Sequence, residues 1–406
     1  MFSDSTARFF PILLCLLVPQ KSLVIQVFLT TLLLLIFSFN ARSQLRFFWG
    51  FSVALGALFC VGVAVRFFAF DQRIFRDLLE LGRFFPLFIL LLTADYWSKF
   101  NLLDLKKALM VFISINFIVC LLQVLDVNLS WLYDLYNSEF HLQNALGISS
   151  RALGLAPGPG QNASISFAVY VVMLSLFFIE KDGEKSALYG TILSLLCIIL
   201  SQSQTGFIAT LGVSVVALSI FSFKLAGRKK RLAQLTLLLG VFSSGYLLYI
   251  LQTRFSYLAS LFTQGLKRSS FVRREEKWQL LMEKSFEQPI QMGFGWGKEY
   301  FGESSGAMDN EWLYIFLVYG AVFFLLTFFL LTYFIVRYFL NIILSWRPLN
   351  ALEFSLWLMC VGGAVIGLAS AFFTQLNILI FIFILWRLSS GASSPRRPFS
   401  KSWSLR

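Results

Sequence analysis

The stretch "GFGWGKEYFGESSGAMDNEWLYIFLVYGAVFFLLTFFLL", residues Gly293 to Leu331, decides the fold class. Its first half is polar and rich in glycine, and its second half is apolar and uncharged. An apolar run of about 20 residues can cross the hydrocarbon core of a bilayer as one helix. The stretch therefore predicts a membrane-spanning helix with a polar, glycine-containing segment directly before it.

The rest of the chain has the same character. Of its 406 residues, 58% are hydrophobic and only 14% are charged, more apolar surface than a water-soluble domain can bury. We predict an all-α polytopic membrane protein in which residues 1–406 form one integral membrane domain. Long apolar runs indicate about twelve transmembrane helices, near 7–19, 23–40, 47–68, 80–96, 105–127, 162–180, 187–201, 206–223, 232–252, 311–336, 353–371 and 374–388.

The basic residues predict the orientation of these helices. Lys and Arg collect in alternate short loops and in the tail 389–406, and such loops usually stay in the cytoplasm. Both termini are therefore expected to be cytoplasmic, and the net charge of +13 reflects topology and anionic membrane lipid, with no nucleic-acid partner. On the opposite, outer side, segments 128–161 and 252–310 are too long to be simple turns. Functional residues often concentrate in loops of this kind.

Metal and cofactor chemistry find little support in the sequence. All five cysteines lie in apolar runs and form no CxxC pair, and His141 is the only histidine. We therefore expect no metal, no cofactor and no disulfide framework. The sequence around His141 favours a surface or interfacial position for this residue.

The second long segment is divided by charge. Residues 254–277 carry six basic residues against two acids, and residues 278–311 carry two lysines against six acids. A basic half followed by an acidic half suits a reaction that needs an anion contact and a proton acceptor. Arg254 and Arg268 are candidate anion contacts on this interpretation, and ordinary solvated charge is the alternative.

A helical pattern distinguishes two neighbouring arginines in that segment. "FVRREEKWQLLMEKSFEQ" has the spacing of an amphipathic helix. At about 100° per residue, Arg274 falls about 40° from Trp278 on the apolar face, whereas Arg273 falls about 140° away. An arginine on an apolar face is costly unless an anion meets it, so Arg274 is the better site candidate. A snorkelling arginine packed along Trp278 is the alternative.

The polar, glycine-rich residues Gly293 to Asn310, here called the polar strip, hold further candidates. Gly293 and Gly295 let the backbone turn sharply and approach a bulky ligand. Asp309, followed by Asn310, stands directly before the apolar run. Asp309 is either a general base at the membrane surface or a helix cap, because a carboxylate at a helix N-terminus commonly only interacts with the dipole.

The first long segment contains "SSRALGLAPGPGQNAS". Its prolines and glycines disfavour helix, and Asn162 or Ser164 can cap the span that follows. Arg151 is either a lone surface charge or a second anion contact. Further on, "SQSQTG" with Gln204 could line a substrate cavity, although a tight hairpin needs the same residues.

Together these motifs resemble those of the O-antigen polymerase and O-antigen ligase superfamily. "RREEKW", "QPIQMGFGWG" and "MDNEWLYIFLVYG" are similar to the late-loop pattern of Arg, Trp, a Pro-Gly-Gly element and His-Asn or Asp-Asn entering a helix. The resemblance covers roughly residues 150–335. The segment from Pro289 to Gly293 is one residue longer than usual, Gln204 replaces a common arginine, and Asp309 stands where ligases carry histidine.

The resemblance implies a metal-independent glycosyltransferase with a GT-C-like membrane fold in the bacterial inner membrane. Arg274 and Arg151 would hold the diphosphate of an undecaprenyl-diphosphate-linked oligosaccharide, and Asp309 would accept the proton of the acceptor hydroxyl. The other candidate substrate contacts are Arg254, Arg268, Gln204, Asn162, Gly293, Gly295 and Asn310. Family members also lead us to expect a chain-length regulator as a partner.

Three functions stay open. The carboxylate at Asp309 favours a polymerase over a ligase, which would transfer the glycan to lipid A-core. A lipid-linked oligosaccharide flippase is the alternative from another class. A transporter is expected to place charges near the bilayer midplane, whereas Arg66 is predicted to snorkel from the outer end of its helix.

Overall fold

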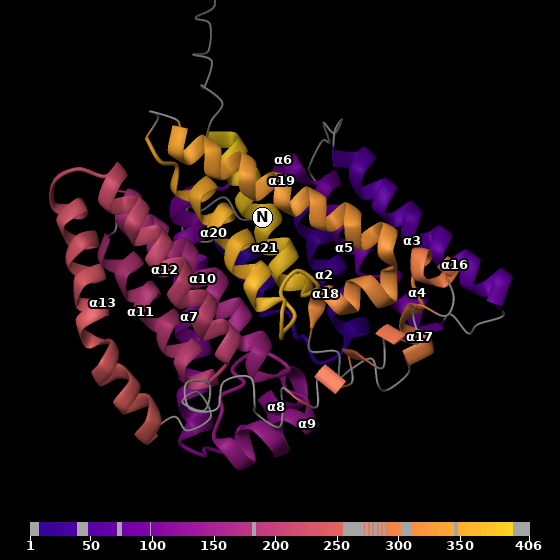
Figure 1. Ribbon diagram of the computed structural model, residues 1–406, viewed down its shortest axis with the longest axis horizontal. Helices are drawn as coiled ribbons and strands as arrows, with labels where there is room; N and C mark the ends of the chain where they lie inside the picture. Colours follow the sequence, from indigo (N-terminus) through magenta and orange to yellow (C-terminus); the bar gives the residue numbers. More distant parts are fainter. Residues whose placement is uncertain are drawn as a thin grey trace, which may run out of the picture.

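The computed structural model is helical throughout its described part (Figure 1). The structure describes residues 8–38, 48–70, 75–97, 99–180, 184–254, 289–301, 310–344 and 348–392, together with isolated positions between 272 and 286. The all-α prediction is confirmed for these residues.

The first half of the chain forms long helices separated by short ones. Its elements are α1 (Phe10–Leu17), α2 (Leu23–Ser38), α3 (Phe48–Phe70), α4 (Phe75–Leu81), α5 (Phe84–Leu92), α6 (Ala94–Trp97), α7 (Leu102–Val124), α8 (Ser130–Tyr136), α9 (Glu139–His141), the π-helix η1 (Leu142–Gly147) and α10 (Pro159–Ile179). Asn101 starts α7 with a capping box, in which its side chain and that of Asp104 each accept a backbone N–H of the other.

The second half of the chain likewise consists of long helices separated by short ones. Its elements are α11 (Glu184–Ser201), α12 (Gln204–Lys224), α13 (Gly227–Arg254), α16 (Pro289–Phe294), α17 (Gly297–Phe301), α18 (Glu311–Tyr314), the π-helix η4 (Ile315–Tyr319), α19 (Ala321–Leu344), α20 (Ala351–Ile366) and α21 (Leu376–Ala392). Asn350 caps α20 by accepting the backbone N–H groups of Leu352 and Glu353.

Helix α10 forms the centre of the larger core. It packs against α7, α11, α12 and α20, and nearly all of its side chains are buried. A helix that is apolar on every side is stable only where other helices surround it. A smaller core joins α3 and η4 through Phe59, Val63, Leu317 and Val318.

Four described helices are long and apolar enough to cross a membrane: α7, α10, α12 and residues 321–342 of α19. Shorter apolar helices lie at 23–36, 56–68, 185–201, 351–366 and 376–389. These helices suggest a multi-pass membrane protein. Few side chains of helix α19 are buried, as expected for a helix that faces lipid.

The predicted span 311–336 is wrong at its start, because the helix is interrupted at Gly320. Residues 311–319 form α18 and η4, and α19 begins only at Ala321. Gly320 adopts φ +93°, a left-handed conformation that favours glycine. Hydropathy missed the break because both sides of it are apolar.

Two further predicted boundaries need correction. The span 80–96 is divided into α4, α5 and α6 by turns near Gly82 and Thr93. The predicted span 162–180 begins earlier, since Pro159 occupies the first turn of α10 and Gly158 is its N-cap. Neither Asn162 nor Ser164 therefore caps this helix.

Gly320→Ala is expected to destabilise the protein. A Cβ atom there would collide with the backbone of Gly293, Phe294 and Gly295, and the left-handed φ adds strain. We expect a loss of about 2 kcal/mol or more, measured as a lower midpoint of thermal unfolding in detergent. Gly212→Ala is the matched control, because a Cβ there meets open space on α12. Equal midpoints for the two variants would contradict this explanation of the break.

Candidate functional site

A buried ion pair holds the first residues of the polar strip, Gly293 to Lys298, in place. Arg66 of α3 is 1% exposed, and its Nε lies 3.0 Å from Asp77 Oδ2. Its Nη1 donates to the carbonyl oxygens of Phe294 and Gly295 at 3.0 and 3.2 Å. Asp77 in turn accepts the backbone N–H of Lys298 at 2.6 Å. Arg66 is therefore a buried clamp on the strip, and the prediction that it snorkels is wrong.

A second charge cluster lies beside this clamp. The Glu80 carboxylate is fully buried and contacts Lys298 Nζ, Arg83 Nη1 at 3.2 Å and the Tyr319 hydroxyl at 3.1 Å. Burial alone would raise the pKa of Glu80, but the charges of Arg83 and Lys298 and the hydrogen bonds hold it below its ordinary value. Glu80 is thus stabilised as an anion between two cations. Arg83 and Lys298 keep about a quarter of their side chains exposed, at 23% and 26%.

Glu311 ties the end of the second long segment to the turn between α20 and α21. Its carboxylate accepts the backbone N–H groups of Phe372, at 3.1 Å, and of Thr374. Its own N–H donates to the Gly367 carbonyl at 2.8 Å. Burial raises the pKa of Glu311, and the N–H donors oppose that rise. Glu311 therefore fixes the entry of α18 against residues 367–375.

The first long segment is shaped by amides from α7. Gln123 Oε1 accepts the backbone N–H groups of Leu153 and Gly154 at 2.9 and 2.8 Å, and Asn116 Oδ1 accepts that of Leu155 at 2.9 Å. Since residues 150–158 of this segment are neither helix nor strand, side chains must satisfy their buried backbone groups. The loop after Arg151 is thus held by hydrogen bonds from its backbone to side chains of α7.

The same turn, residues 367–375, also contacts the first long segment. Ser164 Oγ on α10 donates to the Ala371 carbonyl at 2.9 Å, and Gly160 leaves room for Ser370. Arg83 Nη1 donates to the Thr374 carbonyl at 3.4 Å, which joins the turn to the Glu80 cluster. The first residues of α10 and α18, which directly follow the two long segments, therefore both contact one turn that the sequence did not single out.

Two of the predicted site residues lie near the 151–162 loop. Arg151 is half-buried and its Nε donates to the Ser201 carbonyl at 3.3 Å. Gln204 is the half-buried first residue of α12, directly after the N-cap Ser203. The polar break around Gln204 forms a packed hairpin, in which Ser201, Gln202 and Ser203 are buried.

Asn162 lies inside the protein. It is 1% exposed, its Oδ1 accepts from Asn116 Nδ2 at 2.9 Å, and its Nδ2 contacts Cys120 Sγ at 3.3 Å. A Cβ atom added at Gly154 would lie 2.6 Å from Asn162 Oδ1, so these two residues pack closely. These contacts assign Asn162 to the internal packing of the loop.

The strip residues divide into two kinds. Gly295 has φ +82° and lies against the backbone of Val318 and Gly320, so close packing explains this glycine. A Cβ on Gly293 would meet nothing within 4 Å, which is compatible with an open approach. Asn310 caps α18 by accepting the N–H of Leu313 at 3.0 Å. The capping role considered for Asp309 is therefore filled by its neighbour.

Several predicted residues lie outside the described part of the chain. These are Arg268, Arg274 and Asp309, together with the control position Arg273. Arg254 ends α13, but its side chain is also outside the description. Their candidate roles stay predictions.

Sequence reasoning missed the residues that organise this region: Arg66, Asp77, Glu80, Arg83, Lys298 and Glu311. One signal was available, since a charged residue in an apolar run is expected to face the protein interior and to be paired. The partner could not be found, because the contact from Arg66 to the strip joins residues 228 positions apart.

The described residues contain no group of three His, Cys, Asp or Glu side chains that could hold a metal ion. In comparisons with known proteins, the chain matches no family model and no curated protein. The chemistry of the site must therefore be argued from its own residues. They supply partly exposed cations, an ionised carboxylate and a rigid turn at the junction of the two long segments.

Arg66→Met is expected to lower the free energy of unfolding by about 3–5 kcal/mol, because it leaves the Asp77 carboxylate buried without its cation. Arg66→Met/Asp77→Asn removes both charges and keeps an oxygen for the backbone donors. This double variant should therefore be more stable than Arg66→Met alone. Thermal unfolding in detergent measures both variants. A single variant as stable as the unchanged protein would rule out the clamp.

The Glu80 cluster predicts a dependence of stability on acid. Because the folded-state pKa of Glu80 is lowered, its contribution is present above the ordinary carboxyl pKa, about 4.3, and is lost as the pH falls through the folded value. Glu80→Gln should therefore lose less stability than the unchanged protein between about pH 4.5 and pH 3. Unfolding midpoints across that range test this. If the unfolding midpoints of the two proteins changed in parallel with pH, Glu80 would make no pH-dependent contribution to stability.

Proposed function

We propose that this chain is an O-antigen polymerase, a glycosyltransferase acting at the outer face of the bacterial inner membrane. One observation carries the proposal beyond the motif resemblance: the helices that directly follow the two long segments both contact residues 367–375, through Ser164 of α10 and Glu311 of α18. The motif-bearing residues Arg151 and Asn310 belong to these two segments. Such packing supports one composite site built from distant parts of the chain.

In the proposed reaction the donor is a growing glycan on undecaprenyl diphosphate. The acceptor is the non-reducing end of a new lipid-linked repeat unit. A hydroxyl of the acceptor attacks the anomeric carbon of the donor, whose bond to the diphosphate oxygen breaks. The lipid diphosphate leaves with that electron pair, and the proton of the hydroxyl passes to Asp309. The products are a glycan longer by one unit and free undecaprenyl diphosphate.

Arginine suits the leaving group in this reaction. Its planar guanidinium can form two charge-assisted hydrogen bonds to a phosphate, and it stays charged at any physiological pH. Arg151 and Arg274 are the proposed contacts. Arg83 and Lys298 keep part of their side chains exposed, so they add positive potential near the start of the polar strip.

The finer topology belongs to the same proposal. About twelve transmembrane helices, a GT-C-like arrangement and cytoplasmic termini would place segments 128–161 and 252–310 in the periplasm. Membrane lipid and the undecaprenyl-diphosphate-linked oligosaccharide are the proposed partners. A chain-length regulator is a further proposed partner, on the resemblance alone.

One observation favours a second candidate, a lipid-linked oligosaccharide transporter. Charged residues buried within membrane helices often mark transport pathways, and Arg66 is such a residue. Its guanidinium, however, contacts Asp77 and two carbonyls of the polar strip. These contacts suit a structural clamp, and they favour the polymerase over the transporter.

A lipopolysaccharide gel tests the proposal in a strain that lacks this gene. With the gene restored, a ladder of O-chains should return. Arg274→Ala and Asp309→Ala should each leave a core bearing a single repeat unit, because the donor clamp or the base is lost. Arg273→Ala is the matched control and should keep most of the ladder, since the helical pattern of the sequence predicts it on the opposite helix face. Membrane levels of each variant are measured by immunoblot.

Other gel patterns would overturn the polymerase. Loss of all O-chain with long polymer left on the lipid carrier would indicate a ligase. Loss without any outward-facing repeat units would indicate a flippase. Equal effects of Arg273→Ala and Arg274→Ala would contradict the helix-face assignment.

A further inference from the structure

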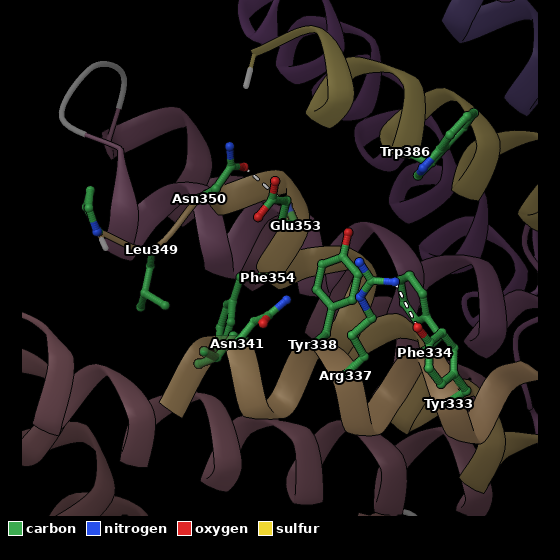
Figure 2. A pocket seen from close by; sticks show the side chains of 12 residues that line it. Tyr333, Phe334, Arg337, Tyr338, Asn341, Leu349, Asn350, Glu353, Phe354 and Trp386 are labelled. Atoms are coloured by element: carbon green, nitrogen blue, oxygen red, sulfur yellow. Dashed lines mark hydrogen bonds between the residues drawn. The ribbon is translucent and has the colours of Figure 1, made fainter. Parts of the chain in front are cut away.

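A separate cavity lies where the C-terminal half of α19 meets the start of α20 and the end of α21 (Figure 2). Its volume is about 860 Å³. Figure 1 shows this end of α19 at the top of the molecule and the short helices α8 and α9 at the bottom. The predicted topology puts the cavity at the cytoplasmic surface, away from the proposed glycosyltransferase site.

The cavity contains two opposite charges. Arg337 on α19 is exposed, and its Nη1 donates to the Tyr333 hydroxyl at 2.9 Å. Glu353 in the first turn of α20 is half-buried. Figure 2 shows the Tyr338 side chain between them. Among the described residues, no ion pair joins Arg337 to Glu353. The arrangement offers a cation and an anion to one ligand.

An apolar groove continues from the cavity along the outer face of α19. It has a volume of about 570 Å³ and shares Tyr333, Arg337 and Asn341 with the cavity. Its other walls include Phe329 and Val336, which are 64% and 48% exposed. An acyl chain can pack against such side chains along α19, so the groove complements the polar cavity.

We propose that the cavity and groove bind a phospholipid with a zwitterionic head group from the cytoplasmic leaflet. Arg337 binds the phosphate, Glu353 binds the ammonium, and an acyl chain lies along Phe329 and Val336. Trp386 and the tyrosines of the cavity have the amphipathic rings that concentrate at membrane interfaces. Charge-assisted contacts at both ends select against head groups that lack the ammonium.

Native mass spectrometry of the purified full chain tests this proposal. Delipidated protein is titrated with phosphatidylethanolamine or phosphatidylglycerol of identical acyl chains. We expect tighter binding of phosphatidylethanolamine. Arg337→Ala should weaken both lipids by about tenfold or more, and Glu353→Gln should weaken phosphatidylethanolamine alone. Arg228→Ala, an exposed arginine at the start of α13, is the control and should leave both affinities unchanged.

Competition with soluble phosphoethanolamine distinguishes an intact lipid from a soluble head group as the ligand. It should compete only weakly, since it lacks the acyl chain that fills the groove. Competition at the affinity of the intact lipid would overturn the lipid assignment in favour of a soluble phosphorylated amine. Unchanged binding in both Arg337→Ala and Glu353→Gln would overturn the site itself.

Discussion

The contact of Arg66 with Asp77 and with the carbonyls of Phe294 and Gly295 is the constraint on which this structure depends. A guanidinium buried in an apolar helix must find an anion and acceptors, and the polar strip and α4 supply them. Once the strip is held there, Lys298 reaches Glu80 and the N–H of Trp296 donates to the Leu317 carbonyl at 2.7 Å. The glycines at 295 and 320 allow the two backbones to come this close.

The turn 367–375 extends this arrangement to the other outer segment. Its backbone is held by Glu311 and Arg83 on one side and by Ser164 on the other. Backbone donors and acceptors outside helices need such partners, so each contact also fixes a segment next to a motif residue. The described residues on either side of the motif residues Arg151 and Asn310 are thus held by contacts with the helical core. The proposed lipid cavity lies at the other end of α19.

Much of the fold could be predicted from the sequence, and the site only partly. Hydropathy located helices near α7, α10, α12 and α20, because long apolar runs have few other stable forms. It could not find the break at Gly320, which depends on a left-handed φ and on contact with the strip. Asn162 appeared to be a cap, whereas the structure buries it beside Asn116 on another helix. Arg66 shows the general limit, since its partners are remote in sequence and periodicity describes only near neighbours.

The central claim is that this chain itself joins lipid-linked repeat units. The most direct measurement is a reaction with the purified protein and one synthetic undecaprenyl-diphosphate-linked repeat unit, with no other protein present. A polymerase should produce a series of longer lipid-linked glycans and, for each bond formed, one molecule of released undecaprenyl diphosphate. A folded protein that returns the repeat unit unchanged, or that only moves it across a vesicle membrane, would contradict the account.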